Sequence, residues 1–270
     1  MRVLLLAALL AASTLNRTAA QTYSPATPVP RTTSLPALRW FATQREVEER
    51  FKIGLAAQGR ADWGAAAAEF ARVTALRPPE PKGSTAWYDL ALAYANLHRY
   101  DDAARALRSA LALDREFLAA MANLIAVDLA RGDLQEARII ADRYVSLDPQ
   151  SARALYSRGL VALHGGDAAT AREDFGKLLH ANPSYAIAHY DLALAEERLS
   201  NYVAAERELR SALELAPAYA RARLALGVVL LRQGRHGAAR DELSRAITDA
   251  SGDPALQNVA AAMRDAIKGP

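Results

Sequence analysis

A repeat of 34 residues constrains the fold of this 270-residue chain more than any other feature. Six alanines mark it, at intervals of 37, 34, 34, 34 and 34 residues: Ala66, Ala103, Ala137, Ala171, Ala205 and Ala239. Small residues recur twelve positions before them, and larger residues four positions after them, at Phe70, Leu107, Phe175, Leu209 and Leu243. Small side chains allow two helices to cross closely, and larger ones fill the space beside the crossing. This pattern therefore predicts that each repeat forms two short helices that pack on each other.

Turn residues lie at the same spacing. Within the repeats, the expected helix stops are Gly132-Asp133, Gly166-Asp167, Ser200-Asn201 and Gly234-Arg235. Between the repeats, proline ends one helix and opens the next at Pro78, Pro149, Pro183 and Pro217. Several positions depart from the pattern. Ile125 replaces a small crossing residue, and Arg158 replaces the usual Leu or Ile.

The chain resembles the tetratricopeptide repeat family, and its second repeat carries the fullest match: Trp87, Leu90, Ala91, Tyr94, Ala103, Leu107 and Ala110. The resemblance implies an all-α fold, a right-handed superhelical solenoid of antiparallel helix pairs within residues 43–253. The six expected units are residues 47–80, 84–117, 118–151, 152–185, 186–219 and 220–253. Residues 254–270 should form a C-terminal capping helix and tail with a polar outer face, in which Asp253 caps the helix and Pro254 begins it.

The N-terminus has the pattern of a bacterial-type signal peptide. Arg2 precedes an apolar run from Val3 to Leu15, and small residues end at Ala20, so we expect cleavage before Gln21. The run is shorter than the roughly 20 residues of a membrane-spanning helix, although an uncleaved anchor is the alternative. Residues 21–42 are rich in Pro, Ser and Thr and should form a linker, with a helix beginning at a capping box at Thr43. The protein is therefore expected to be exported, periplasmic or secreted, without a stable membrane span.

Composition excludes several classes of function. The chain has no cysteine, which removes disulfides and thiolate chemistry. It has 33 Lys and Arg and 30 Asp and Glu, and removing Arg2 and Arg17 with the leader leaves 31 against 30. A nearly neutral chain with interspersed charges is not typical of nucleic-acid binding. We expect no nucleic-acid partner.

No catalytic or cofactor-binding constellation is evident in the sequence. The five histidines, at positions 98, 164, 180, 189 and 236, lie outside any zinc-binding motif, and no phosphate-binding loop or nucleophile elbow is present. The carboxylates of Asp101-Asp102 and Glu196-Glu197 are adjacent in sequence, and neighbours on a helix do not face each other. We predict no enzyme activity, no metal and no cofactor.

The resemblance implies that the first helix of each pair lines a concave groove that binds a protein or peptide partner. The residues expected there are Tyr88, Leu92, Asn123, Arg153, Tyr156, Leu160, His164, Tyr190, Leu194, Arg198, Arg221 and Arg232. Tyrosine and arginine are enriched at binding hot spots, and arginine pairs well with carboxylates. We therefore expect a scaffold or adaptor in the cell envelope that binds a peptide or helix. The alternative is an accessory docking subunit of an envelope enzyme or an assembly or secretion complex, using the convex face or end caps. The oligomeric state stays open.

Overall fold

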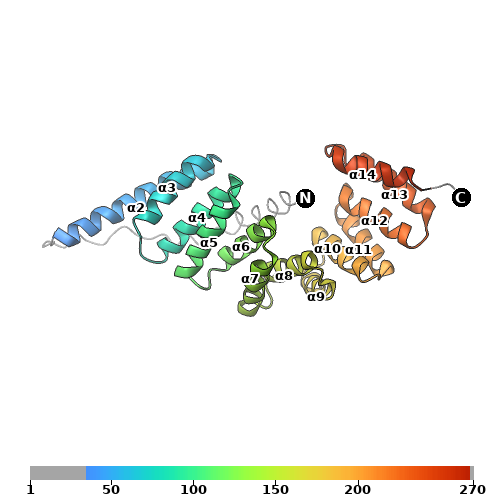
Figure 1. The fold of residues 1–270 in the computed structure, drawn as a ribbon, viewed down its shortest axis with the longest axis horizontal. Helices are drawn as coiled ribbons and strands as arrows, with labels where there is room; N and C mark the ends of the chain where they lie inside the picture. The colour runs from blue at the N-terminus through green and yellow to red at the C-terminus, as the bar shows by residue number, and fades with distance from the viewer. Residues whose placement is uncertain (1–34, 268–270) are drawn as a thin grey trace. The chain divides into compact units, whose positions relative to one another are not determined.

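The computed structural model describes residues 35–267, which are helical throughout apart from short connections (Figure 1). The helices in chain order are α2 (Leu35–Gly59), α3 (Trp63–Ala75), α4 (Lys82–Asn96), α5 (Tyr100–Leu113), α6 (Leu118–Arg131), α7 (Leu134–Leu147), α8 (Ala152–Gly165), α9 (Ala168–Ala181), α10 (Ala186–Arg198), α11 (Tyr202–Leu215), α12 (Ala220–Arg232), α13 (His236–Asp249) and α14 (Pro254–Asp265). The all-α prediction is confirmed.

The chain divides into two compact units, residues 1–147 and 148–270. Unit 1 contains the helix pairs α2–α3, α4–α5 and α6–α7, and unit 2 contains α8–α9, α10–α11 and α12–α13, followed by α14. Within each unit the second helix of one pair packs against the first helix of the next, as α9 does on α10 and α11 on α12. Each unit is thus a short solenoid, because every pair buries its apolar side chains on its neighbours.

Close helix crossings form the centre of each pair. A Cβ atom added to Gly54, Gly159 or Gly227 would lie 2.8, 2.6 or 2.7 Å from the side chain of Phe70, Phe175 or Leu243, respectively. These distances are well inside van der Waals contact, so the bulky residue sixteen positions later occupies the space of the missing side chain. The glycines are therefore required by the packing of the helix pair.

Two of the residues that depart from the repeat pattern, Ile125 and Arg158, are accommodated by local changes. Ile125 of α6 is fully buried, and so is Ala141 of α7, the residue sixteen positions later. In this pair the large side chain lies on the first helix and the small one on the second, the reverse of the other pairs. The total packed volume therefore stays similar. Arg158 of α8 donates hydrogen bonds of 2.7 Å from both Nε and Nη2 to Asp174 of α9, whose side chain is inaccessible to solvent. The carboxylate of Asp174 thus pairs with the arginine that replaces Leu or Ile at this position.

The turn inside each repeat has the same geometry. A residue with positive φ ends the first helix at six equivalent positions: Ala61, His98, Gly132, Gly166, Ser200 and Gly234. The amide of the following residue then donates back to the carbonyl five positions earlier, as from Asp133 to Asp128 at 2.8 Å and from Asn201 to Glu196 at 2.8 Å. This is the hydrogen bond of a Schellman motif, which satisfies carbonyl groups at the helix end. Glycine adopts the left-handed conformation most easily, so Gly132, Gly166 and Gly234 are the least strained of the six.

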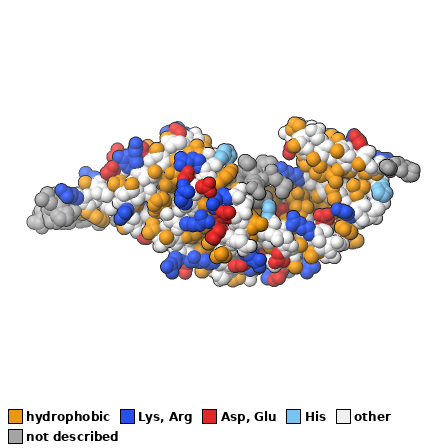
Figure 2. Space-filling model, in the orientation of Figure 1, with side chains coloured by type: hydrophobic (Ala, Val, Ile, Leu, Met, Phe, Trp, Pro, Cys, Tyr) orange, Lys and Arg blue, Asp and Glu red, His pale blue; other side chains and the backbone are white. Residues whose placement is uncertain are grey.

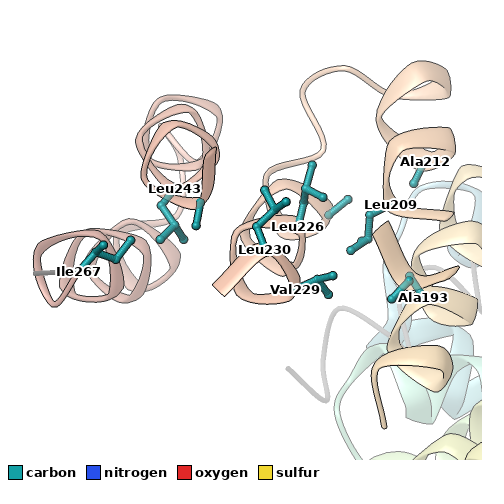
Figure 3. Packing of buried hydrophobic residues seen from close by; sticks show 11 residues of the cluster. Ala193, Leu209, Ala212, Leu226, Val229, Leu230, Leu243 and Ile267 are labelled. Carbon is teal, nitrogen blue, oxygen red and sulfur yellow. The ribbon is translucent and has the colours of Figure 1, made fainter. Parts of the chain in front are cut away.

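A continuous apolar core runs through unit 2 from α10 to the C-terminal helix. Figure 3 shows Leu209, Leu226, Leu230 and Leu243 pointing into the space between successive helices, with Ile267 at the end of the cluster. Asp253 caps α14 by accepting a 3.1 Å hydrogen bond from the amide of Leu256, and Pro254 is the first helical residue. Both of these predictions are confirmed.

The prediction at the N-terminal end of the array is wrong. Helix α2 begins at Leu35, so residues 35–42 are not linker, and Thr43 lies inside the helix with its hydroxyl donating to Arg39 O at 2.9 Å. Pro36 is compatible with this start because the first helical amides need no intrahelical acceptor. The outer face of α14 is mixed, with exposed Asn258 and Asp265 beside Val259, which is 49% exposed. The predicted signal peptide and residues 21–34 of the predicted linker lie outside the described residues.

The crossing geometry gives a testable expectation. Gly159→Ala should destabilise the protein by about 1–3 kcal/mol because the new methyl group overlaps Phe175. Adding Phe175→Leu should recover much of this loss, since it recreates the Ala193–Leu209 combination of the following repeat. Urea unfolding of the three proteins measures the effect.

Gly176→Ala is the matched control, because nothing lies within 4 Å of a Cβ atom at this helical position. It should be neutral or stabilise by up to about 1 kcal/mol through helix propensity. Equal unfolding midpoints for Gly159→Ala and Gly176→Ala would contradict the packing role.

Candidate functional site

Five of the twelve predicted groove residues are buried. Tyr88 and Leu92 of α4, Asn123 of α6, and Tyr156 and Leu160 of α8 each expose 9% or less of their surface. This differs from the sequence-based expectation, which placed all twelve side chains against a partner. Neighbouring helices cover these residues, so they pack inside the units and are not exposed to a partner. The seven remaining residues are at least partly exposed, and all of them belong to unit 2.

Two of the buried tyrosines join successive repeats by hydrogen bonds at equivalent positions. In unit 1, Asn123 Nδ2 donates to the hydroxyl of Tyr88 at 3.1 Å. In unit 2, the hydroxyl of Tyr156 donates to Asp191 Oδ2 at 2.9 Å. Both bonds span 35 residues and link the first helix of one pair to the first helix of the next. They therefore fix how adjacent first helices lie side by side.

Asp191 lies at the centre of a tyrosine cluster in unit 2. Tyr156 packs on Tyr185 with ring centroids 5.5 Å apart, and Tyr190 packs on Tyr219 at 5.2 Å. Burial raises the pKa of Asp191 to about 7, although the hydrogen bond from Tyr156 lowers it. Burial, together with the Asp191 charge, also raises the pKa of the tyrosines. The cluster thus holds a carboxyl group that ionises only at a cost in stability.

The loops that carry Tyr185 and Tyr219 are held by equivalent contacts. His189 Nε2 donates to Pro183 O at 2.9 Å, and its Nδ1 contacts Glu208 Oε2 at 2.8 Å. One repeat later, Arg223 donates to Pro217 O and, at 3.2 Å, to Glu242 Oε2. A basic side chain of the first helix therefore ties the preceding loop to the second helix in both repeats. This fixes the tyrosines that border the face.

The partly exposed residues form what we call the first-helix face: Arg153 and His164 of α8, Tyr190, Leu194 and Arg198 of α10, and Arg221 and Arg232 of α12. Helix α10 contacts both α8 and α12, so the three helices present one face of unit 2. Arg198 donates to Leu163 O, and His164 Nδ1 donates to Leu160 O at 2.8 Å. Over residues 35–267, Arg221 and Arg232 show neither a hydrogen bond nor an ion pair. Their guanidinium groups are available to a ligand.

An open pocket of about 310 Å³ adjoins the start of α12. Its walls include the apolar side chains of Ala250 and Leu256 and the ring of Tyr219, with Arg221 at the same site. Asp249 and Asp253 also line it, but Asp249 accepts from Arg223 and Asp253 caps α14. Arg221 is therefore the pocket's charged group that remains without an ionic partner among the described residues.

Asp191, Tyr185 and Tyr219 were missed by the sequence analysis. Tyr185 and Tyr219 are 34 residues apart, and Asn123 and Asp191 occupy the same register two repeats apart, so the repeat itself held the signal. Polar residues at a buried repeat position indicate hydrogen bonding between repeats.

On the molecular face shown in Figure 2, basic and acidic side chains lie beside one another rather than in separate patches.

The described residues also set limits on other kinds of site. Within them, no cluster of three or more His, Asp or Glu side chains is arranged to hold a metal ion. No helix between Leu35 and Asp265 combines the length and hydropathy required to cross a bilayer.

Replacing Asp191 by Asn should change how stability depends on pH. Because burial raises the pKa of Asp191 to about 7, against about 3.9 in an unfolded chain, ionisation destabilises the fold as pH rises from about 4 to about 7. Asn stays neutral, so Asp191→Asn should match the parent at pH 4 and exceed it by about 2–4 kcal/mol at pH 8. Urea unfolding at pH 4, 6 and 8 measures the difference, and parallel profiles would contradict it.

Comparisons with known proteins agree with this architecture. Family models described as tetratricopeptide repeat match residues 51–116, 97–159, 156–219 and 190–254. A comparison with curated proteins gave no match. A tetratricopeptide repeat protein from Parabacteroides merdae is similar in structure, with a TM-score of 0.67 and 17% identity, over 82% of this chain and 98% of that one.

Two further solved structures have the same fold. A chain of the APC/C hetero-tetramer Cut9–Hcn1 has a TM-score of 0.66 and 20% identity, over 83% of this chain and 43% of that one. MamA from Desulfovibrio magneticus has a TM-score of 0.59 and 19% identity, over 64% of this chain and 97% of that one. The family models together span residues 51–254, and the helix pairs repeat at the same spacing. The chain belongs to the tetratricopeptide repeat family.

Proposed function

We propose that this protein is a non-enzymatic adaptor of the cell envelope that binds a partner peptide or helix on the first-helix face of unit 2. Proteins of this family generally act as protein-interaction scaffolds. The observation that carries the proposal is the combination of partly exposed Tyr190 and Leu194 with Arg221 and Arg232, which have no ionic partner among residues 35–267. Apolar contact area beside arginine is typical of binding hot spots.

The support beneath the face favours tight binding. Tyr156 and Asp191 join α8 to α10, and His189 and Arg223 fix the adjoining loops. A partner therefore meets side chains whose backbone is already ordered, so little conformational entropy is lost from the scaffold on binding. The partner's own ordering then dominates the entropic cost.

Exposed apolar residues on second helices favour a second candidate function. Val203 of α11 is 80% exposed, and Ile139 of α7 is 61% exposed. Such side chains suit docking through the opposite, convex side of a helix pair, as an accessory subunit of an envelope enzyme or assembly complex would require. Single exposed apolar residues are common on protein surfaces, so this candidate ranks second.

The envelope location is supported by the N-terminal sequence, where Arg2 precedes the apolar run Val3–Leu15. Expression of the full chain in a bacterial host should yield a mature protein that begins at Gln21. Intact mass and N-terminal sequencing of the periplasmic and membrane fractions measure this. Recovery of the uncleaved chain in the membrane would support the anchor instead, and recovery in the cytoplasm would remove the envelope from the proposal.

A crosslinked pull-down from the envelope fraction should separate the two candidate functions. Leu194→Glu with Arg232→Glu should abolish capture of a partner that binds the first-helix face, because it removes apolar contact and reverses one charge. Val203→Glu, on a second helix, should leave that capture unchanged. All variants should retain the parent's helicity by circular dichroism.

Loss of the captured protein with Val203→Glu alone would move the binding site to the convex side. Capture that survives both changes would exclude the two surfaces tested, and the adaptor proposal would then lack a site in unit 2.

A further inference from the structure

An acidic side chain recurs at one position on the second helices of unit 2. Asp174, Glu208 and Glu242 follow one another at intervals of 34 residues, and each exposes 13% or less of its side chain. The first helix of the same pair supplies a basic partner to each acid: Arg158 to Asp174, His189 to Glu208, and Arg223 to Glu242. Arginine keeps its charge at any physiological pH, whereas histidine changes charge between about pH 5 and 8. The His189 pair is therefore the one of these three whose charge depends on pH.

The two contacts of His189 require a proton on each ring nitrogen. Nε2 lies 2.9 Å from Pro183 O, and because a carbonyl oxygen can only accept, Nε2 must carry a hydrogen. Nδ1 lies 2.8 Å from Glu208 Oε2, and a lone pair facing a carboxylate oxygen at this distance would be repulsive. A proton therefore lies between Nδ1 and Oε2 as well. The bonded arrangement holds one more proton than a neutral imidazole beside an ionised carboxylate.

The other charged groups around His189 assign this proton to the imidazole. Glu208 Oε1 also accepts two hydrogen bonds from Arg207 of α11, at 2.9 and 3.0 Å, and a guanidinium partner favours the ionised carboxylate. Asp191, two residues further along α10, is buried in the tyrosine cluster. His180 lies exposed in the last turn of α9, the helix that packs on α10. The bonded state is thus an imidazolium between a carboxylate and a carbonyl oxygen.

The imidazolium ties a loop to a helix. Pro183 belongs to the loop that leads to Tyr185, and the ring of Tyr185 packs on Tyr156 with centroids 5.5 Å apart. His189 thus connects the loop that carries Tyr185 to Glu208 of α11. A neutral imidazole cannot maintain both contacts, because one ring nitrogen then presents a lone pair to an acceptor. Loss of the proton therefore removes one contact, and the loop is no longer tied to α11.

The following repeat has the same tie in a permanent form. Arg223 donates to Pro217 O and, at 3.2 Å, to Glu242 Oε2 of α13. Its guanidinium serves both acceptors without losing a proton at any physiological pH. Loop 216–219 is the counterpart of loop 182–185, 34 residues further along the chain. Unit 2 therefore contains a pH-dependent tie and a pH-independent tie at equivalent positions.

We propose that His189 is a proton-dependent tie that orders loop 182–185 at acidic pH and releases it as pH rises. The charged contact contributes to stability while the imidazole is protonated, and this contribution is lost as pH rises from about 5 to 8. Tyr185 gains freedom when the tie opens, and the packing of its ring on Tyr156 weakens. A partner that requires an ordered first-helix face would then bind more tightly at acidic pH, and this consequence alone rests on the proposed function.

Spin labels on the two loops test the tie. The chain has no cysteine, so Ser184→Cys and Ala218→Cys each provide a single labelling site at an exposed position of the corresponding loop. Both are made in the full mature chain together with Asp191→Asn, which removes the other buried group that ionises in this pH range. Between pH 5.5 and pH 8, the mobile component of the EPR spectrum should increase at least about twofold for the label at residue 184. It should stay unchanged for the label at residue 218.

Two substitutions at His189 separate a proton effect from a structural one. His189→Arg introduces the residue of the permanent tie and should keep the label at residue 184 immobile at both pH values. His189→Gln cannot carry the charge and should give the mobile component at both pH values. Circular dichroism checks that each variant retains the parent's helicity.

An unchanged spectrum at residue 184 across the pH range would overturn the proposal, and so would the same increase in His189→Arg. An equal increase at residue 218 would also overturn it, since it would indicate a general loosening of unit 2. The measurement requires no partner. Its failure would therefore leave the proposed binding face in place, and a failed pull-down would leave the tie in place.

Discussion

The close crossing of the two helices in each repeat is the contact on which the structure depends. A glycine or alanine on the first helix receives a Phe or Leu sixteen residues later, as Gly159 receives Phe175. Neither helix could bury this contact alone, and short isolated helices are marginal in water. The turn geometry and the stacking of pairs follow from this contact, because both position the next crossing at the same spacing. The third repeat exchanges large and small, with Ile125 and Ala141, and keeps the same architecture.

The two units use the repeat differently, although both stack helix pairs. Unit 1 buries Tyr88, Leu92 and Asn123, so its first helices keep none of the predicted contact residues at the surface. In unit 2, the hydrogen-bonded pair Tyr156 and Asp191 is buried beneath the first-helix face. The aromatic, apolar and basic side chains of that face are partly exposed. Burying the carboxyl group of Asp191 costs free energy of folding. Its position beneath the candidate face is consistent with a role in holding the first helices of unit 2 in register.

The side chains of this face are of the types that the proposed recognition of a peptide requires. Arginine and tyrosine beside aliphatic side chains provide charge-assisted hydrogen bonds and contact area, which suit a peptide more than a reacting substrate.

The sequence by itself determined the repeat, the all-α class and the cap at Asp253, because helix pairs must follow wherever the small and large residues recur. It also identified the first helices of unit 2 as carriers of Arg221 and Arg232. Only the tertiary structure decided which candidates remain exposed, because burial of Tyr156 or Leu160 depends on neighbouring repeats and not on position within one repeat. It also decided the start of α2 at Leu35, where local proline content had indicated a linker. The Asp191 cluster required residues from several helices and loops, and their proximity follows from packing between repeats.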